Sequence, residues 1–381
     1  MLRLIFLFLI AFLVGADEFL LGPILTPIGA DLSVPPERIA LFITAYSLPL
    51  AVMAPLLGGL SDRYGRLAVL VPATLVFGLA SIATSMIPSF GTGIATRILT
   101  GAASGGMLGI AMAMAGDLGE RGAAKAIAFV TSGLTFGIIL SPGIGAVSAA
   151  FWSWRFAFGA IGGAALIVVL VGLMSRRAAG LPDRQPASGT TGTAGPLFVP
   201  GALGSLIAMA AGLGGAIGCF ALVGERLRSL FGWDTTTIGM IYAAFGILTL
   251  VGNAAMPVAL RRIGSGRALM RIALIFVLLA IVATYASNTL GPVPILLALA
   301  IWAVLGGIGA PGLQTHIAQL SPSRRGALMA LAGSSMNLGV ADASALAAGV
   351  YPAGPAWVAA VGAGLIAVAI IALRPVPARL K

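Results

Sequence analysis

The sequence predicts an all-α integral membrane protein, with twelve transmembrane helices arranged as two six-helix bundles. Of its 381 residues, 59% are hydrophobic and only 9% are charged, against roughly 25% charged residues in an ordinary soluble domain. A series of apolar runs, each long enough to cross a bilayer, is divided into two sets of six by one long polar stretch. A soluble enzyme, a secreted module and a disordered protein are excluded, because so few charges could not cover a water-exposed surface.

Charged or Gly/Pro-rich breaks separate the apolar runs. The runs cover residues 4–30, 37–60, 67–87, 90–115, 124–149, 154–174, 197–224, 236–260, 268–288, 293–319, 326–350 and 356–373. Leu2–Val14 looks like the core of a signal peptide, but no cleavage site follows, so we expect one continuous, retained first helix. Residues 1–174 are then the N-terminal bundle, 175–196 a flexible cytoplasmic linker and 197–381 the C-terminal bundle.

The net charge of +11 indicates membrane topology rather than nucleic-acid binding, because the basic residues stand in short loops between apolar runs. With a cytoplasmic N-terminus, 17 loop Lys and Arg residues fall on the inner side and 4 on the outer side. Both termini are therefore expected in the cytoplasm, and the Arg, Ala and Gly bias suggests a bacterial inner membrane. The charged group Glu225, Arg226, Arg228 and Asp234 is interpreted as a solvated outer loop. The single cysteine, Cys219, excludes an intrachain disulfide.

Two adjacent carboxylates, Asp17 and Glu18, lie near the middle of the first predicted helix, where an ionised carboxylate is costly and usually functional. Successive helical residues point about 100° apart, so the two carboxylates need not share a role. Glu18 continues a stripe of small residues, Ala11, Gly15 and Gly22, that suits the interior of a helix bundle. We expect Glu18 to be the carboxylate of a central cavity, with Asp17 as the alternative.

Four further polar residues interrupt predicted helices and are candidates for function. Arg97 cannot lose its proton, so it must face a carboxylate, carbonyl groups or water, unless it extends to the outer interface. Asn337 and Asp342 lie in an otherwise small and apolar helix, where Asp342 either couples transport or is a protonated packing group. His316 is the only histidine. Arg97, Asn337 and His316 are candidate substrate-binding residues, although a lone helical histidine is also compatible with simple packing.

A charged, glycine-containing segment joins the second and third predicted helices: Gly58-Gly59-Leu60-Ser61-Asp62-Arg63-Tyr64-Gly65-Arg66. Its glycines permit close helix approach and a tight reversal, and its charged residues can bond to neighbouring helix ends. At this place among twelve helices, the segment resembles the signature loop of the major facilitator superfamily. The resemblance implies a conformational latch, in which the gating residues are Gly58, Asp62, Arg63, Gly65 and Arg66.

The fifth predicted helix carries small residues and a proline, namely Gly133, Gly137, Ser141, Pro142, Gly143 and Gly145. Positions 133, 137 and 141 form one smooth face for tight helix packing. The stretch also resembles the Gly-x-x-x-Gly-Pro-x-x-Gly element of proton-coupled exporters in this superfamily, with Ser141 in place of the second glycine. The segment Asp17–Leu32 similarly resembles the first helix of drug and sugar exporters. Packing and a role in export both stay open for the fifth helix.

The resemblance implies two bundles that rock about a central site and export a small organic compound, such as a drug, sugar or metabolite, in exchange for protons. Glu18, or else Asp342 or Asp17, would carry the proton. No cofactor is expected beyond the proton gradient. The expected partners are the substrate, protons and the bilayer, and the chain is expected to be a monomer.

Two other functions stay open at this point. One is a proton-coupled uptake symporter of the same fold. The other is a non-transporting receptor or a membrane enzyme, against which the sequence offers no Walker-type phosphate loop and no spacing typical of a catalytic triad or metal site.

Overall fold

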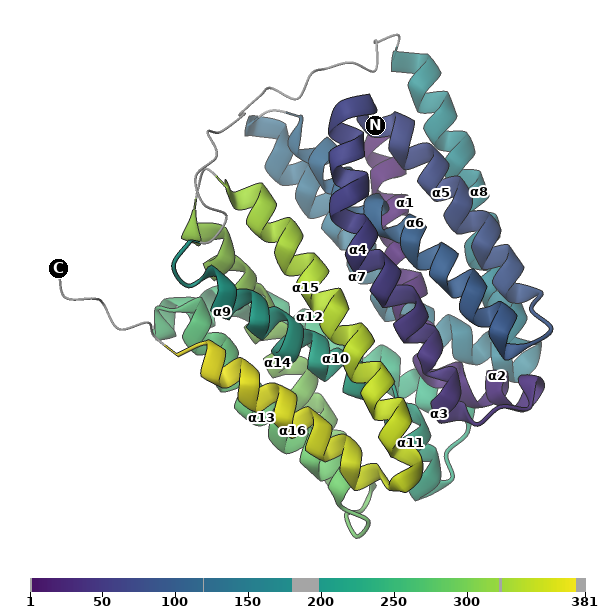
Figure 1. Cartoon of the computed structure of the whole chain (residues 1–381), viewed down its shortest axis with the longest axis vertical. Helices are drawn as coiled ribbons and strands as arrows, with labels where there is room; N and C mark the ends of the chain where they lie inside the picture. The colour runs from purple at the N-terminus through teal and green to yellow at the C-terminus, as the bar shows by residue number, and fades with distance from the viewer. Residues whose placement is uncertain (1, 119, 180–198, 322–323, 375–381) are drawn as a thin grey trace, which may run out of the picture. The chain divides into compact units, whose positions relative to one another are not determined.

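The computed structural model describes residues 2–118, 120–179, 199–321 and 324–374. Two compact units make up the chain. Unit 1 comprises Met1–Thr190 with Leu227–Ala244, and unit 2 comprises Thr191–Arg226 with Phe245–Lys381. Residues 180–196 of the predicted linker lie outside the described residues. Within the described residues the regular structure is helical throughout (Figure 1), which confirms the predicted fold class.

The helices of the first half of the sequence all belong to unit 1. They are α1 (Leu2–Phe19), the 3-10 turn η1 (Gly22–Ile24), α2 (Leu25–Leu32), α3 (Pro36–Ile39), α4 (Leu41–Tyr64), α5 (Arg66–Ser85), α6 (Phe90–Gly116), α7 (Glu120–Phe151) and α8 (Trp154–Ala179). Here α1 packs against α6, α7 and α8, while α4 packs on α6, and α5 on both α6 and α8.

The helices of unit 2 come from the second half of the sequence. They are α9 (Ala202–Ile207), the π-helix η2 (Ala208–Gly214), α10 (Gly215–Phe220), α13 (Gly266–Ala286), α14 (Pro292–Leu320), α15 (Arg325–Val350), the 3-10 turn η4 (Tyr351–Ala353) and α16 (Pro355–Ala372). The chain crosses between the units inside α11 (Val223–Phe231) and again inside α12 (Thr235–Ile263).

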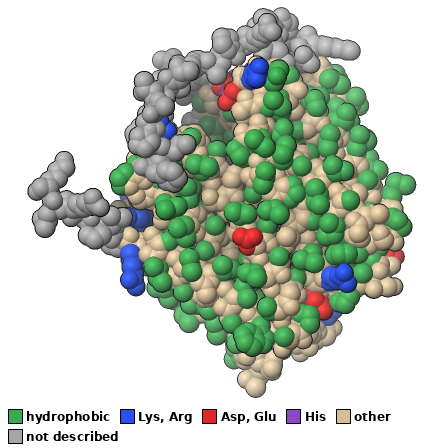
Figure 2. Space-filling view, viewed as in Figure 1, with side chains coloured by type: hydrophobic (Ala, Val, Ile, Leu, Met, Phe, Trp, Pro, Cys, Tyr) green, Lys and Arg blue, Asp and Glu red, His purple; other side chains and the backbone are tan. Residues whose placement is uncertain are grey.

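Membrane-spanning character is evident along the described chain. Eleven helical stretches are long and apolar enough to cross a bilayer. The remaining predicted span is α15, a helix of 26 residues whose Ser, Asn and Asp side chains make it less apolar. Figure 2 shows hydrophobic side chains spread over the visible face and few charged ones. Such a surface suits contact with lipid.

Three predicted segments differ from the structure. The first helix is not continuous, because the 3-10 turn η1 contains Pro23, which has no backbone N–H to donate, beside Gly22. The sixth helix, α8, continues to Ala179, five residues into the predicted linker. The seventh span extends to Phe231, so the first three charged residues of the predicted outer loop belong to α11. A proline can interrupt a helix inside an apolar run, and a helix can continue through charged residues, so hydropathy alone does not mark where helices begin and end.

Glycines set the distance between helices within each unit. A Cβ atom on Gly133 or Gly137 of α7 would overlap a carbonyl oxygen of α1, that of Phe8 or Phe12 respectively. In unit 2, a Cβ atom on Gly339 of α15 would overlap the carbonyl oxygen of Ala210 in η2. These backbones touch directly, as expected where helices associate in lipid by close packing rather than by the hydrophobic effect.

The crossing of α1 and α7 can be tested by adding single methyl groups to α7. Gly137→Ala should lower the free energy of unfolding by about 1–3 kcal/mol, because its Cβ atom meets the Phe12 carbonyl and forces the helices apart. Gly143→Ala is the matched control, since a Cβ atom there meets nothing within 4 Å and alanine favours a helix over glycine. Thermal unfolding in detergent measures both variants, and equal losses would contradict the close crossing.

Candidate functional site

A buried ion pair joins α1 to α6 within unit 1. One terminal nitrogen of Arg97, Nη1, donates to both carboxylate oxygens of Asp17, at 2.9 and 2.8 Å. The two side chains are 1% and 0% exposed. The side chain of Arg97 therefore points to Asp17 inside the helix bundle, and the alternative that it extends to the outer interface is excluded.

Two aromatic rings complete the surroundings of the Arg97 guanidinium. Its Cζ atom lies 4.6 Å from the centre of the Tyr46 ring on α4 and 5.6 Å from that of the Phe158 ring on α8. Each ring attracts the cation through its negative face. Within the described residues the Nε atom of Arg97 has no hydrogen-bond partner. Side chains of α1, α4, α6 and α8 thus meet around one positive charge.

Glu18 is in a different situation from its neighbour Asp17. Its side chain is partly exposed, and Tyr46 is close enough to interact electrostatically with both carboxylates. Among the described residues, no hydrogen bond or ion pair holds the Glu18 carboxylate. The structure therefore separates one paired, buried carboxylate from one partnerless carboxylate beside it.

The loop between α4 and α5 marks one end of unit 1, called here the Asp62 end. Arg66 forms an ion pair with Asp62, and its Nη1 atom also donates to the Ser61 hydroxyl at 3.0 Å. Its Nε atom lies 3.8 Å from a carboxylate oxygen of Asp117, at the end of α6. Sequence reasoning missed Asp117, because it considered only charges of the loop itself. Arg66 thereby connects this loop to a third helix.

Gly65 and Gly58, at the two ends of the signature loop, differ in backbone conformation and in surroundings. Gly65 has a φ of 101°, which favours glycine, and it makes the reversal into α5. Arg63 lies over the Tyr64 ring at 5.3 Å. Among the described residues, a Cβ atom on Gly58 would meet nothing within 4 Å, so the structure shows no close helix approach at this position.

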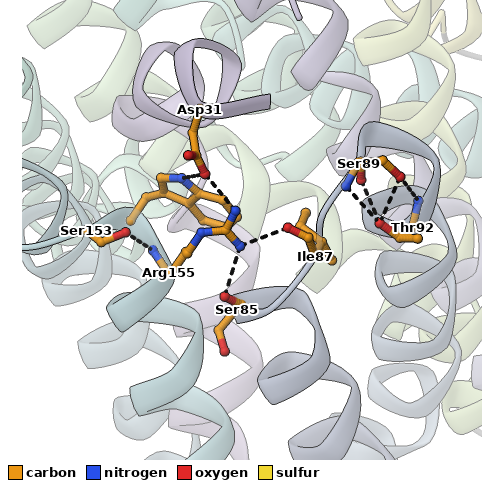
Figure 3. A network of polar contacts seen from close by, with 8 residues as sticks. Asp31, Ser85, Ile87, Ser89, Thr92, Ser153 and Arg155 are labelled. Carbon is orange, nitrogen blue, oxygen red and sulfur yellow. Dashed lines mark hydrogen bonds and ion pairs between the residues drawn. The ribbon is translucent and has the colours of Figure 1, made fainter. Parts of the chain in front are cut away.

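A polar clasp closes the opposite end of unit 1, called here the Asp31 end (Figure 3). Arg155 donates from Nη2 to Asp31 at 2.7 Å and from Nη1 to the carbonyls of Ser85 and Ile87, at 3.1 and 2.9 Å. The indole nitrogen of Trp154 donates to the same Asp31 oxygen at 3.1 Å. The clasp joins the ends of α2, α5 and α8, and a cation suits the C-terminal carbonyls of α5.

Unit 2 contains a corresponding contact made by Arg226 of α11. This residue is 4% exposed, and it donates to the carbonyls of Thr284 and Ser287 at 3.0 and 2.8 Å, at the C-terminal end of α13. It also donates to the side chain of Asn288 at 2.7 Å. The predicted solvated loop is therefore wrong for Arg226, because open carbonyls at a helix end bind it inside the protein.

The remaining charged residues of that predicted loop are also engaged. Asp234 is exposed, but its Oδ1 atom accepts a hydrogen bond from the backbone N–H of Thr237 at 2.9 Å, near the start of α12. Bonds from the side chain and the backbone of Thr237 lower the pKa of the Asp234 carboxyl below its usual value, because they stabilise the charged form. Arg228 donates to Thr26 and Thr235.

The other candidates lie apart from the carboxylates of α1. In unit 2, Asn337 is 6% exposed and donates to the Gly333 carbonyl at 3.1 Å, while Asp342 is exposed and His316 partly exposed. Within the described residues, the Nε2 atom of His316 and the Oδ1 atom of Asn337 have no hydrogen-bond partner. In unit 1, Ser141 is 3% exposed and its hydroxyl is likewise without a partner there.

In the stretch of α7 that resembles the exporter element, residues 133–145, most glycines pack against neighbouring helices. Gly133 and Gly137 pack on α1, as described above, and a Cβ atom on Gly145 would lie 2.7 Å from Leu20. The carbonyl of Pro142 lies 3.3 Å from the position of a Cβ atom on Gly239. Helix packing therefore accounts for most of this stretch. In the described part of the chain, no group of three or more His, Cys, Asp or Glu residues could hold a metal ion.

Known transporters resemble this chain, one of them over almost its whole length. It is 25% identical, over 97% of this chain and 94% of the other, to YbcL, an uncharacterized MFS-type transporter of Bacillus subtilis. A bacillibactin exporter of the same organism is 33% identical over 36% of each chain.

Two solved structures share the fold at low sequence identity. The human organic anion transporter MFSD10 superimposes with a TM-score of 0.69 at 19% identity, covering 98% of each chain. The nucleoside transporter NupG, solved as a mutant, superimposes with a TM-score of 0.76 at 14% identity, covering 97% of this chain and 98% of the other. The family model of the Major Facilitator Superfamily matches residues 7–302 and 202–381. The chain therefore belongs to the major facilitator superfamily, as its helices and its signature loop also indicate. It is a secondary transporter and not an enzyme.

Proposed function

We propose that this transporter exports a small organic compound from the cytoplasm in exchange for protons, and that Glu18 carries the proton. The observation that supports this most is the contrast between the two adjacent carboxylates of α1. The Asp17 carboxylate accepts two hydrogen bonds from Arg97, whereas the partly exposed Glu18 carboxylate has no partner in the described residues. A partnerless charge within a membrane is costly, so a proton or a substrate cation must neutralise Glu18.

In the proposed transport cycle, the proton and the substrate compete for Glu18. A proton that enters from the outer side binds Glu18 and is released on the inner side, where substrate then binds to the deprotonated site. Export rather than uptake is favoured by the exporter-like stretches of α1 and α7 and by the similarity to a bacillibactin exporter. Asn337, His316 and Asp342 are proposed to contribute to substrate binding from unit 2, with Asp342 as the second candidate for coupling.

The orientation belongs to the same proposal. The Asp62 end of unit 1 would face the cytoplasm, and the Asp31 end would face the outside, because basic residues concentrate in loops on the cytoplasmic side. Both termini would then lie in the cytoplasm of a bacterial inner membrane. The chain is proposed to act as a monomer.

Glu18→Gln should abolish dependence of transport on the pH gradient, because glutamine mimics the protonated acid and cannot release a proton. Exchange of substrate for substrate, which moves no net proton, should persist. Both activities can be measured in proteoliposomes with a panel of radiolabelled organic compounds, under gradients of either direction. The sign of the gradient that drives substrate out of the vesicles also decides between export and uptake.

Glu37→Gln is the matched control for this substitution, since Glu37 lies in the first turn of α3, away from the carboxylates of α1. It should leave gradient dependence intact. Full gradient dependence in Glu18→Gln, together with its loss in Asp342→Asn, would move the coupling role to Asp342.

Asp17→Asn should act on stability more than on coupling, because it leaves the charge of Arg97 buried and unpaired. Breaking a buried pair costs about 3–5 kcal/mol, and thermal unfolding in detergent should register this loss. Asp31→Asn is the control, because its pair with Arg155 is 43% and 33% exposed and such surface pairs contribute about 1 kcal/mol or less. Equal losses in the two variants would contradict a special role for the buried pair.

Asp62→Asn should weaken the latch at the Asp62 end, because Arg66 loses its partner in the loop and keeps only Ser61 and the more distant Asp117. Transport should fall while substrate binding in detergent survives, since the proposed binding groups lie elsewhere. Binding by calorimetry and transport in proteoliposomes separate the two effects. A parallel loss of binding and transport would count against a gating role.

A further inference from the structure

The segment Leu227–Ala244 comes from the second half of the sequence, yet it belongs to unit 1. It contains the last part of α11 and the beginning of α12. Tyr242 of this segment contacts the first span at η1, between α1 and α2, and Arg228 contacts it at α2. These contacts suggest a role for the segment in access to Glu18, which rests on the proposed function of Glu18 in proton coupling.

Tyr242 of this segment lies directly on Gly22 of η1. A Cβ atom on Gly22 would overlap Cε1 of Tyr242 and lie 2.9 Å from its hydroxyl oxygen. The ring is only 3% exposed, and Gly22 is buried as well. The absence of a side chain on Gly22 is therefore what makes room for the tyrosine ring.

Gly22 follows Glu18 by four residues. The α-helix α1 ends at Phe19, and a bend at Leu20 and Leu21 leads into η1, which begins at Gly22. Gly22 also lies on the Asp31 side of Glu18. Tyr242 thus covers the first span at a point between Glu18 and the end of the unit that we assign to the outside.

Two further contacts hold the segment in this place. One turn before Tyr242, a Cβ atom on Gly239 would overlap the Cβ atom of Ala146 on α7. At the other end of the segment, Arg228 donates to the hydroxyl of Thr26 on α2 and to that of Thr235. The segment is therefore fixed against both α7 and the first span, just beyond Glu18.

We propose that Tyr242 is the outer gate residue of the coupling site, whose ring on Gly22 closes the path between Glu18 and the outside. Uptake of an external proton then requires the Leu227–Ala244 segment to move away from η1. Tyr242 is a positioning residue in this scheme, because it controls access to Glu18 and carries no proton itself.

The experiment measures access to position 18 directly. Cys219, the only cysteine of the chain, is replaced by alanine, and Glu18→Cys introduces a reporter thiol. A membrane-impermeant maleimide is then applied from the outside to oriented vesicles. With Tyr242 present, we expect slow labelling, and adding Tyr242→Ala should raise the labelling rate several-fold.

Two control variants separate the ring from general disturbance of α12. Tyr242→Phe keeps the ring on Gly22 and should label as slowly as the parent. Met240→Ala changes a side chain that is 61% exposed on the same helix, and it should also label slowly. Rapid labelling of the parent, or an unchanged rate in Tyr242→Ala, would overturn the gate.

A second measurement keeps the proposal testable if the Glu18→Cys variant does not fold. Tyr242→Ala in the otherwise native chain should leak protons into proteoliposomes without substrate, and Tyr242→Phe should not. Faster labelling in Tyr242→Ala without a proton leak would leave the gate standing and refute proton carriage by Glu18. A native chain that holds the gradient no better than Tyr242→Ala would overturn the gate.

Discussion

The permanent positive charge of Arg97, buried inside unit 1, constrains the positions of the helices around it. A guanidinium keeps its proton at any physiological pH, and Arg97 is almost completely removed from solvent. Asp17 and two aromatic rings compensate the charge from three other helices. Because Asp17 is held in this way, α1 can neither rotate nor slide without exposing an uncompensated cation. The neighbouring residue, Glu18, is thereby fixed on its own face of the helix.

Direct backbone contacts at glycine residues also fix the helix crossings in both units. In unit 1 a Cβ atom on Gly101 of α6 would overlap the Tyr46 carbonyl on α4, one helical turn from Arg97. In unit 2 a Cβ atom on Gly252 of α12 would overlap the Val304 carbonyl on α14. Such contacts leave little freedom for the helices to slide past one another at these crossings.

Sequence reasoning predicted the number and type of spans because hydropathy is a local property. It also identified Asp17, Glu18 and Arg97 as unusual, since charges within apolar runs stand out. It could not pair Asp17 with Arg97, which are separated by 80 residues, because no periodicity links positions so far apart. Arg226 looked like a loop residue for the same reason: its carbonyl acceptors are about 60 residues away in the chain, in a helix end that the sequence does not mark.

The assignment of Leu227–Ala244 to unit 1 has a consequence for how the protein is made. The ribosome delivers the chain from the N-terminus, and domains generally fold in the order of their synthesis. Here the first unit stays incomplete until the eighth span begins to emerge, so Gly22 and Ala146 are uncovered while the seventh span is already being inserted. The packing at Gly22 and Ala146 is therefore completed only after residues 227–244 have been synthesised.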